Sequence, residues 1–371
     1  MHADLLRALP APACAYVYDT AALRARAAMV RRALPPKATL LYAVKANGHP
    51  AVVEALAGVC DGLEVASGGE LALAVTAGAR RIVFGGPAKT DAELRAAVAA
   101  GALINVESEH ELRRLAAIAP RPPQVCLRVN RPGGGLRGSH TMTGAPTPFG
   151  IDESRLGEAL RVPGVEVVGF HLHAVSNNLD GTAHAAFVRD ALDWSLRAAG
   201  SNGVDLRVVN VGGGFGIDYQ SRAEMDLSDL SSVVVPAGLD LIFEPGRYLA
   251  ADAGAYAATV LDLKTTHGRT FAVLRGGTHH FRLPAAWGYS HPFTIVPVDD
   301  WPHPYPRPEV TDTEVDAVGE LCTPRDVLTR GRHVTRLRAG DILVFARAGA
   351  YGWDISHHEF LRHDPPVFVI V

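Results

Sequence analysis

The sequence predicts an α/β fold in which a (β/α)8 barrel is joined to a second, β-rich domain. Three observations support this prediction. Short apolar runs alternate with alanine- and leucine-rich helical stretches over the first two thirds of the 371 residues. Unusual polar residues follow these runs at many points of the chain. Beyond about residue 260 the helical pattern ends, and short alternating runs typical of strands replace it.

The apolar runs have the length of buried parallel strands. The first contains Tyr42 to Asn47, and seven more follow at residues 62–66, 81–85, 103–106, 125–129, 167–173, 206–211 and 239–243. Eight such runs alternating with helices predict a closed barrel, and an open doubly wound sheet is the main alternative.

The positions of the polar residues favour the barrel. All strand ends of a barrel face one mouth, whereas an open sheet gathers its ligand at one switch point. The residues at or near the predicted strand ends are Lys45, Glu64, Arg128, His171, His173, the glycines after Val211, and Glu244. Their spread over many strands indicates a shared mouth.

The β-rich domain is predicted from runs at residues 271–274, 293–298, 315–318, 342–345 and 367–371. A run at residues 14–18 precedes the barrel and could pair with this domain. We therefore expect the barrel to span residues 22–258, and the β-rich domain to combine residues 1–21 with 259–371.

Composition excludes several classes of partner. Hydrophobic residues make up 48% and charged residues 20%, as in ordinary globular enzymes, and the net charge of -3 gives no reason to expect nucleic acid or an anionic membrane. No apolar run is long enough to span a bilayer, and no signal peptide is recognisable, so we expect a cytoplasmic location. The four cysteines lack the spacing of a metal site or a disulfide framework.

Lys45 is the first candidate catalytic residue, because it lies in an apolar run. A desolvated lysine loses affinity for its proton and becomes an amine that can form a Schiff base. The alternative is an ordinary lysine at a strand end, whose ammonium group reaches water.

Two further motifs suit a phosphorylated ring. Gly212, Gly213 and Gly214 leave backbone amides open to a phosphate, at a position where barrels often bind one, although a tight turn is the alternative. Glu244 suits a ring nitrogen that must stay protonated, and Arg247 suits a phosphate. The alternative for this pair is a structural ion pair.

Three other candidates have weaker patterns. His171 and His173 lie on one face of a strand, which permits a zinc site or a satisfied polar pair, but the other strand ends lack further zinc ligands. Cys322 is an unusual residue for a polar loop, and Arg325 nearby would favour its thiolate, although an inert thiol is commoner. Tyr351 lies in a glycine-rich turn and is either a phosphate donor or a packed tyrosine.

Taken in order, these motifs resemble the fold-type III pyridoxal-phosphate enzymes, in the group that includes diaminopimelate and ornithine decarboxylases. The matching segments are YAVKAN from Tyr42, HLHAVS from His171, GGGF from Gly212, EPGR from Glu244, GELCTPRD from Gly319 and GAY from Gly349. The resemblance covers nearly the whole chain. It implies a pyridoxal 5′-phosphate-dependent amino-acid decarboxylase that works as a homodimer.

The resemblance also implies residue roles. Lys45 would bind the cofactor covalently, His173 would stack on its ring, and Glu244 would pair with the ring nitrogen. Arg128 would lie near the phenolic oxygen, and Cys322 would be the general acid, contributed across the dimer interface. Asp326 matches the acid of the same loop. The remaining cofactor contacts would be Glu64, Ser176, Gly212, Gly213, Gly214, Gly246, Arg247 and Tyr351.

Two departures from the family pattern concern the substrate and the phosphate. Val175 replaces the glycine that usually precedes the phosphate-contacting serine. Thr323 replaces an acid that meets the distal amino group of the substrate, and Arg325 follows. A missing acid and an added base predict a neutral or anionic distal end.

This pattern resembles the siderophore-pathway branch, of staphyloferrin B type, that decarboxylates citryl-diaminopropionate. The candidate substrate contacts are His140, His279, Arg282, Thr323, Arg325 and Asp326. Alternatives are a decarboxylase of diaminopimelate or another basic amino acid, an amino-acid racemase, a non-catalytic cofactor carrier, and a zinc amidohydrolase that uses His171 and His173. Cys322 argues against the racemase, and no metal is expected.

Overall fold

The computed structural model describes residues 3–133, 136–221 and 223–371, which form two compact units. One unit, here called the barrel unit, comprises the described parts of Leu23–Asp218 and Ala223–Leu249. The other, the sheet unit, comprises the described parts of Met1–Ala22, Tyr219–Arg222 and Ala250–Val371. The domain limits 22–258 and 1–21 with 259–371 stay a prediction.

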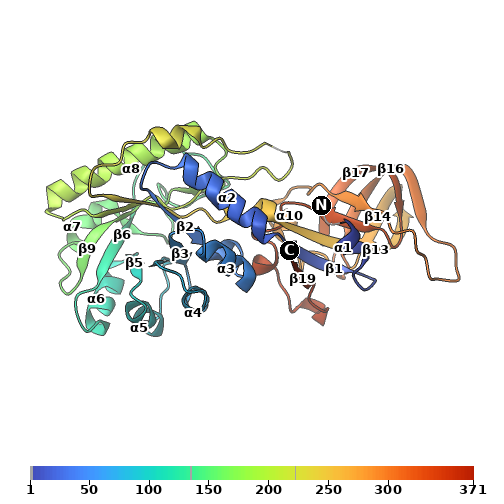
Figure 1. The fold of residues 1–371 in the computed structure, drawn as a ribbon, viewed down its shortest axis with the longest axis horizontal. Coiled ribbons are helices and arrows are strands. Elements are labelled where there is room, and N and C mark those ends of the chain that lie inside the picture. Colours follow the sequence, from blue (N-terminus) through green and yellow to red (C-terminus); the bar gives the residue numbers. More distant parts are fainter. Residues whose placement is uncertain (1–2, 134–135, 222) are drawn as a thin grey trace. The chain divides into compact units, whose positions relative to one another are not determined.

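The barrel unit confirms the predicted closed barrel (Figure 1). All neighbouring strands of the barrel pair in parallel, and the circle closes because β12 pairs with β2 while β5 pairs with β6. The strands are β2 (Thr39–Ala43), β3 (Gly62–Val65), β4 (Ile82–Phe84), β5 (Leu103–Val106), β6 (Gln124–Asn130), β9 (Glu166–His171), β11 (Val208–Asn210) and β12 (Asp240–Phe243). The open-sheet alternative is therefore wrong.

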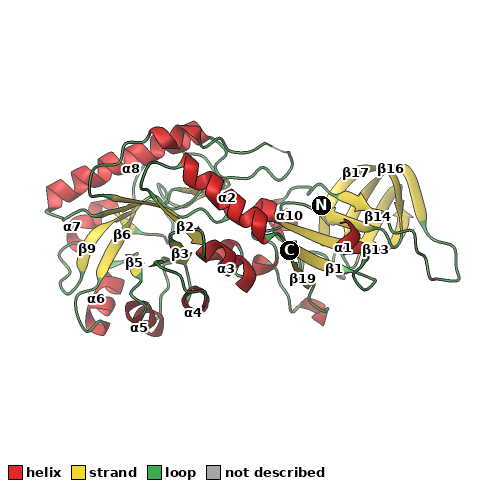
Figure 2. Ribbon diagram, in the orientation of Figure 1, coloured by secondary structure: helices red, strands yellow, loops and turns green. Residues whose placement is uncertain are grey.

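Helices lie outside these strands, as Figure 2 shows for α4, α5, α6 and α8. The helices are α2 (Thr20–Ala33), α3 (Pro50–Ala57), α4 (Gly68–Thr76), α5 (Asp91–Ala99), α6 (Glu109–Ile118), α7 (Leu156–Ala159), α8 (Gly181–Asn202) and α9 (Arg247–Ala250). Short strands β7 (His140–Thr141) and β10 (Val175–Ser176) pair with each other, and β8 (Ile151–Asp152) pairs with β6.

The start of several barrel helices follows from their sequence. Ser67, Thr90, Ser108 and Asp180 precede α4, α5, α6 and α8, and each side chain accepts a hydrogen bond from the backbone amide three residues later. Such caps satisfy amides that have no partner inside the helix. They therefore fix where each loop at the barrel mouth ends.

The sheet unit is built on an eight-stranded, mostly antiparallel sheet. Six of its strands follow the order β15-β18-β13-β14-β16-β17, and β1 and β19 lie off this path. Strand β1 pairs with β13 and β19, which confirms the predicted pairing of the run at residues 14–18 with this unit. The elements are α1 (Ala3–Arg7), β1 (Cys14–Tyr18), β13 (Gly254–Thr266), β14 (Arg269–Leu274), α10 (Leu283–Trp287), β15 (Thr294–Val296), β16 (Glu309–Val318), β17 (Val327–Arg338), β18 (Ile342–Phe345) and β19 (Val367–Ile370).

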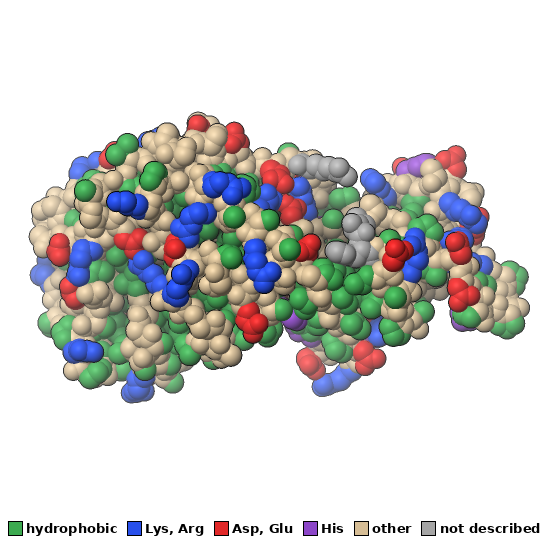
Figure 3. Space-filling model, viewed as in Figure 1, with side chains coloured by type: hydrophobic (Ala, Val, Ile, Leu, Met, Phe, Trp, Pro, Cys, Tyr) green, Lys and Arg blue, Asp and Glu red, His purple; other side chains and the backbone are tan. Residues whose placement is uncertain are grey.

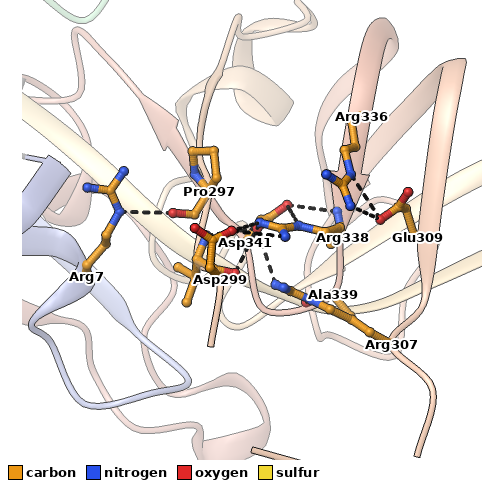
Figure 4. A network of polar contacts seen from close by, with 10 residues as sticks. Arg7, Pro297, Asp299, Arg307, Glu309, Arg336, Arg338, Ala339 and Asp341 are labelled. Carbon is orange, nitrogen blue, oxygen red and sulfur yellow. Dashed lines mark hydrogen bonds and ion pairs between the residues drawn. The ribbon is translucent and has the colours of Figure 1, made fainter. Parts of the chain in front are cut away.

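A polar network fixes the turn between β17 and β18 (Figure 4). The buried Asp341 carboxylate accepts hydrogen bonds from the Arg338 amide and guanidinium, and Arg307 lies 3.3 Å from the same carboxylate. Nearby, Glu309 of β16 pairs with Arg336 of β17 at 2.7 Å. Arginines in this corner are thus matched by carboxylates.

Charged side chains of both signs are interspersed over the face shown in Figure 3, in keeping with the small net charge. Among the described residues, no helix combines the length and hydropathy needed to cross a membrane.

Candidate active site

Lys45 lies just past the end of a barrel strand, and this corrects the predicted strand boundary. Strand β2 ends at Ala43, and Lys45 lies in the following 3-10 turn, Val44–Ala46. Its side chain is 45% exposed, and its Nζ lies 2.7 Å from Oε2 of the buried Glu64. The expected burial of the amine is therefore wrong for this structure. The ammonium instead has a carboxylate partner and access to solvent.

Gly246 permits close packing against the Lys45 turn. A Cβ at Gly246 would lie 2.8 Å from the Ala46 side chain and 2.9 Å from the Ala43 carbonyl oxygen. Any side chain here would displace the turn. The EPGR segment after β12 therefore contributes shape to the site, besides its charged residues.

His173 follows β9 and rests against the glycine loop. Its Nδ1 accepts a hydrogen bond from the Gly213 amide at 3.2 Å, so the ring proton is assigned to Nε2. A Cβ at Gly212 would lie 2.4 Å from that same Nδ1. Burial, with Arg128 and Lys45 nearby, holds the pKa of His173 well below its usual range. The ring is therefore neutral and held by the loop.

Glu244 is a buried acid that directly follows β12. Its Oε1 accepts a hydrogen bond from Asn210 Nδ2 at 2.5 Å, and its Oε2 lies 3.6 Å from His171 Nε2. Burial, reinforced by the negative charge of Glu64, raises the pKa of Glu244 to about 7. Burial also holds the pKa of His171 well below its usual range, so their contact is polar rather than ionic.

Arg128 lies on β6 and is fixed by a buried acid. Its Nη1 donates to Oε1 of Glu107 at 2.9 Å, and both side chains are nearly fully buried. The guanidinium carbon also lies 4.6 Å from the centre of the Phe149 ring. The Glu107 carboxylate accepts a further hydrogen bond from the Gly150 amide at 3.0 Å. Arg128 is thus held in one orientation without a ligand.

A second buried pair supports Glu107 from behind. Lys89 Nζ lies 2.7 Å from Oε1 of Glu111, and Oε2 of Glu111 accepts a hydrogen bond from the Glu107 amide at 2.9 Å. Lys89 also donates to two backbone carbonyls. Buried charges are tolerated when they are paired and hydrogen-bonded in this way.

The glycine loop lies close to its neighbours at each of its three glycines. A Cβ at Gly213 would lie 2.4 Å from the Glu244 carbonyl oxygen, and one at Gly214 would lie 2.8 Å from the Val175 carbonyl oxygen. Gly212 and Gly214 also have positive φ angles of 68° and 96°. Among the described residues, the Gly214 amide has no hydrogen-bond acceptor. Gly214 therefore lets the loop pack against the Val175 backbone and leaves one amide available.

The other predicted phosphate contacts are dispersed over both units. Ser176 lies in β10 of the barrel unit, and the buried Arg247 begins α9. Tyr351 lies in the sheet unit, in the turn after β18, with a positive φ of 52°. Their phosphate contacts stay predictions.

The loop that carries Cys322 joins β16 to β17 in the sheet unit. Cys322 is exposed, whereas Asp326 is buried. Asp326 accepts hydrogen bonds from the amides of Thr278 and Leu321 at 2.6 and 2.9 Å. A Cβ at Gly319 would lie 2.2 Å from Asp326 Oδ2. This acid therefore holds the loop in shape, while the thiol faces outward.

The structure places the predicted substrate contacts in different surroundings. Arg282, Thr323 and Arg325 line one hollow of the sheet unit. His279 is buried, with Nε2 3.4 Å from Glu320 Oε1, which does not favour direct contact with a ligand. His140 is exposed on β7 of the barrel unit. None of these contacts is tested by the structure, and they stay predictions.

The barrel-mouth residues fit a pyridoxal group better than a metal. Among the described residues, no cluster of three or more His, Cys, Asp or Glu side chains could hold a metal ion. The mouth instead offers an amine, a buried acid and a neutral imidazole. The Gly214 amide is also available there, and Nε of Arg128 and both ring nitrogens of His171 are buried without a hydrogen-bond partner. These groups can serve an aldehyde, a ring nitrogen and a phosphate.

Three supporting residues were missed at the sequence level. Asn210 is a polar residue inside an apolar run, and Glu107 directly follows another apolar run. Both could have been predicted by the pattern that indicated Glu64, a polar residue at or near the end of an apolar run. Glu111 lies in a helix and carried none, because its role depends on contacts that only the fold creates.

Comparison with known proteins agrees with this geometry. The pyridoxal binding domain of the pyridoxal-dependent decarboxylases matches residues 20–251. A relative from Staphylococcus aureus, 2-[(L-alanin-3-ylcarbamoyl)methyl]-2-hydroxybutanedioate decarboxylase, is 38% identical over 99% of this chain and 96% of its own length. Diaminopimelate decarboxylase from Aquifex aeolicus is 31% identical over 94% of this chain and 84% of its own.

Among solved structures, diaminopimelate decarboxylase from Helicobacter pylori complexed with L-lysine has a TM-score of 0.87 and 24% identity, covering 100% of this chain and 94% of that one. This likeness shows the fold. The sequence-based prediction of family and cofactor is confirmed by the family match and the relatives. The chain belongs to the pyridoxal-dependent decarboxylases and is an amino-acid decarboxylase that uses pyridoxal 5′-phosphate.

Proposed function

We propose that this decarboxylase acts on a citrate amide of 2,3-diaminopropionate, the compound in the name of the Staphylococcus aureus relative. The amino-acid end would lose its α-carboxylate as CO2, and a proton would take its place on Cα. The other end of this compound carries the carboxylates of citrate. A site for it must therefore recognise an amino acid and a polyanion.

The observation that carries this proposal is the composition of the hollow in the sheet unit. Thr323, Arg282 and Arg325 line it, and none of the described residues that line it is an Asp or Glu. A substrate with a distal ammonium would need an acid there, whereas carboxylates are well matched by guanidinium groups. The hollow therefore supports an anionic distal end.

The barrel residues supply the chemistry in this proposal. Lys45 would hold the cofactor covalently, and the neutral His173 would pack on its ring. Glu244 would face the ring nitrogen, and a cation there would favour the ionised acid. Arg128 would lie by the phenolic oxygen, and the phosphate would be held by Ser176, Gly212, Gly213, Gly214, Gly246, Arg247 and Tyr351. When bound, the cofactor accepts the electrons that the lost carboxylate leaves behind.

A proton must return to Cα, and two groups of this chain are suited to donate it. Cys322 is an exposed thiol on a loop whose backbone is fixed by Asp326. Lys45 is the second candidate, because an amine at this position could deliver a proton to Cα. Because Cys322 is exposed, we include in the proposal a homodimer in which this loop completes the partner's site. A cytoplasmic location also stays a prediction.

The direct test is the identity of the product. Full-length protein loaded with pyridoxal phosphate is incubated with the citrate amide, and CO2 and the product mass are measured. We expect equal amounts of CO2 and a product that lacks one carboxylate, and neither with Lys45→Ala. Release of CO2 by Lys45→Ala at the wild-type rate would contradict the assignment.

Decarboxylation of diaminopimelate or another basic amino acid is the second candidate. It is supported by several relatives named diaminopimelate decarboxylase, of which the one from Deinococcus radiodurans is 34% identical over 94% of this chain. Thr323 argues against it, because it provides no charge for a distal ammonium. A non-catalytic carrier of the cofactor is the remaining alternative, and any CO2 release excludes it.

A further inference from the structure

One hollow of the sheet unit has a volume of about 730 Å³. We call it the arginine hollow. It lies among three segments that are far apart in the sequence, at residues 278–290, 323–330 and 357–360. Its size is in the range of sites that bind small molecules. Its polar lining includes Arg282, Thr323, Arg325, Arg330 and His357.

The three arginines are not paired with acids. Among the described residues, no carboxylate lies within ion-pair distance of Arg282, Arg325 or Arg330. This differs from other arginines of the same unit. Arg275 pairs with Glu320 at 2.5 Å, and Arg336 pairs with Glu309 at 2.7 Å. Three guanidinium groups around one hollow without a counter-charge create a field that attracts anions.

The backbone of each arginine is nevertheless fixed. The Arg282 amide donates to Ser356 Oγ at 3.0 Å, the Arg325 amide to Thr323 Oγ1 at 3.3 Å, and the Arg330 amide to Ser290 Oγ at 3.1 Å. The side chains thus extend from anchored points.

His357 adds a group that is neutral at pH 7. Its partial burial and the nearby charge of Arg282 lower its pKa. A neutral imidazole offers one donor and one acceptor, which suits a hydroxyl group beside carboxylates. The lining therefore matches a ligand that has several carboxylates and a hydroxyl.

We propose that the arginine hollow binds a tricarboxylate of the citrate type, with Arg330 and His357 as contacts besides Arg282 and Arg325. The choice of citrate rests on the proposed function, in which the substrate carries a citrate end. Each guanidinium binds a carboxylate by charge-assisted hydrogen bonds, and loss of one such contact weakens binding about 10- to 100-fold.

The test is calorimetric titration of citrate into the full-length, cofactor-loaded protein at constant ionic strength. We expect saturable binding that Arg330→Gln weakens at least about tenfold. The control is Arg336→Gln, which removes the same charge six residues further along β17, from the pair with Glu309 that Figure 4 shows, and leaves citrate binding unchanged. Thermal unfolding confirms that both variants fold.

Three results would overturn the proposal: no saturable binding of citrate, equal weakening by both variants, or equally tight binding of sulfate. Its failure is distinguishable from failure of the proposed function. If citrate binds but no CO2 is released from the citrate amide, the proposed function is wrong and the proposed citrate site in the hollow remains supported. If CO2 is released but citrate does not bind, the hollow is wrong and the function stands.

Discussion

The barrel mouth and the arginine hollow both gather charged side chains, but they balance the charges differently. At the mouth, Lys45 lies against Glu64, and Arg128 is held by Glu107. In the hollow, Arg282, Arg325 and Arg330 have no carboxylate partner among the described residues. The cations of the barrel mouth are therefore balanced by neighbouring carboxylates, whereas the arginine hollow keeps a positive charge.

This difference separates chemistry from specificity. Buried, paired charges keep one geometry before any ligand arrives, which is what a catalytic site requires. Exposed cations without partners recognise whatever anion fits between them, and they change at little cost to stability. Relatives with one chemistry can therefore differ in substrate, as the names of the two relatives illustrate.

The largest effect on activity is expected from removing Lys45 at the barrel mouth. Lys45→Ala should lower decarboxylation by at least about a thousandfold, because it removes the covalent anchor of the cofactor. The absorbance of the bound cofactor should change with it. The exposed Lys264→Ala should alter neither, and equal loss in both variants would contradict the assignment.

The next prediction tests whether the Glu107 carboxylate balances the charge of Arg128 at the barrel mouth. Glu107→Ala leaves Arg128 buried without its anion and should lower the free energy of unfolding by roughly 3 kcal/mol or more. Urea unfolding measures this. The control Glu158→Ala removes an acid from an exposed pair with Arg155 and should change the free energy by less than about 1 kcal/mol. Equal changes would refute the supporting role of Glu107.

The buried acid of the mouth predicts a pH dependence. A raised pKa means that folded, cofactor-free protein holds a proton on Glu244 that the unfolded chain releases near pH 4.5. Its contribution to stability is present below pH 4.5 and is lost as the pH rises through about 7. Between pH 5 and pH 8, wild type should therefore lose up to about 3 kcal/mol relative to Glu244→Gln. Parallel curves of unfolding free energy against pH would contradict this.

The packing of the glycine loop gives a smaller effect. Gly212→Ala and Gly203→Ala both place a methyl group on a backbone with φ near +67°, but only Gly212 faces a neighbour, at 2.4 Å. Gly203 ends α8 and has open space. Gly203→Ala should lose about 1 kcal/mol of stability, and Gly212→Ala should lose more, because its methyl group also displaces His173. Only Gly212→Ala should weaken cofactor binding, by about tenfold, because it displaces His173. Equal cofactor affinities in the two variants would disprove that His173 contacts the cofactor.

The smallest expected effect is a change in KM when an acid is added to the arginine hollow. Thr323→Glu adds an acid to the hollow and should raise KM for the citrate amide about tenfold, because it neutralises one arginine. The same change should lower KM for a substrate with a distal ammonium. Thr311→Glu, on the exposed part of β16, should change neither value. An unchanged KM for both substrates in Thr323→Glu would mean that the hollow does not sense the distal group.

Much of the fold was predictable because its signals are local. Eight apolar runs correspond to the eight barrel strands, and Glu64, Arg128 and Glu244 lie at or near their ends as predicted. The exact end of β2 was not predictable, because Val44 and Ala46 continue the apolar pattern into a 3-10 turn. Periodicity does not distinguish the last strand residue from the first turn residue.

The supports of the site were harder to predict. Glu107 gains its role from Arg128 on the next strand, and the hollow forms from segments separated by tens of residues. The burial of His279 beside Glu320 was likewise not predictable, and its substrate contact stays a prediction. Pairing across elements is a property of the tertiary structure and leaves no periodic trace in the sequence.

The most direct measurement is the ratio of kcat/KM for the citrate amide to kcat/KM for meso-diaminopimelate, with one preparation of cofactor-loaded protein. A cationic hollow predicts a ratio above about 100, since at least two charge-assisted contacts separate the substrates. A ratio of one or less would contradict the account, because the chemistry of the mouth would then operate without any preference for an anionic distal end.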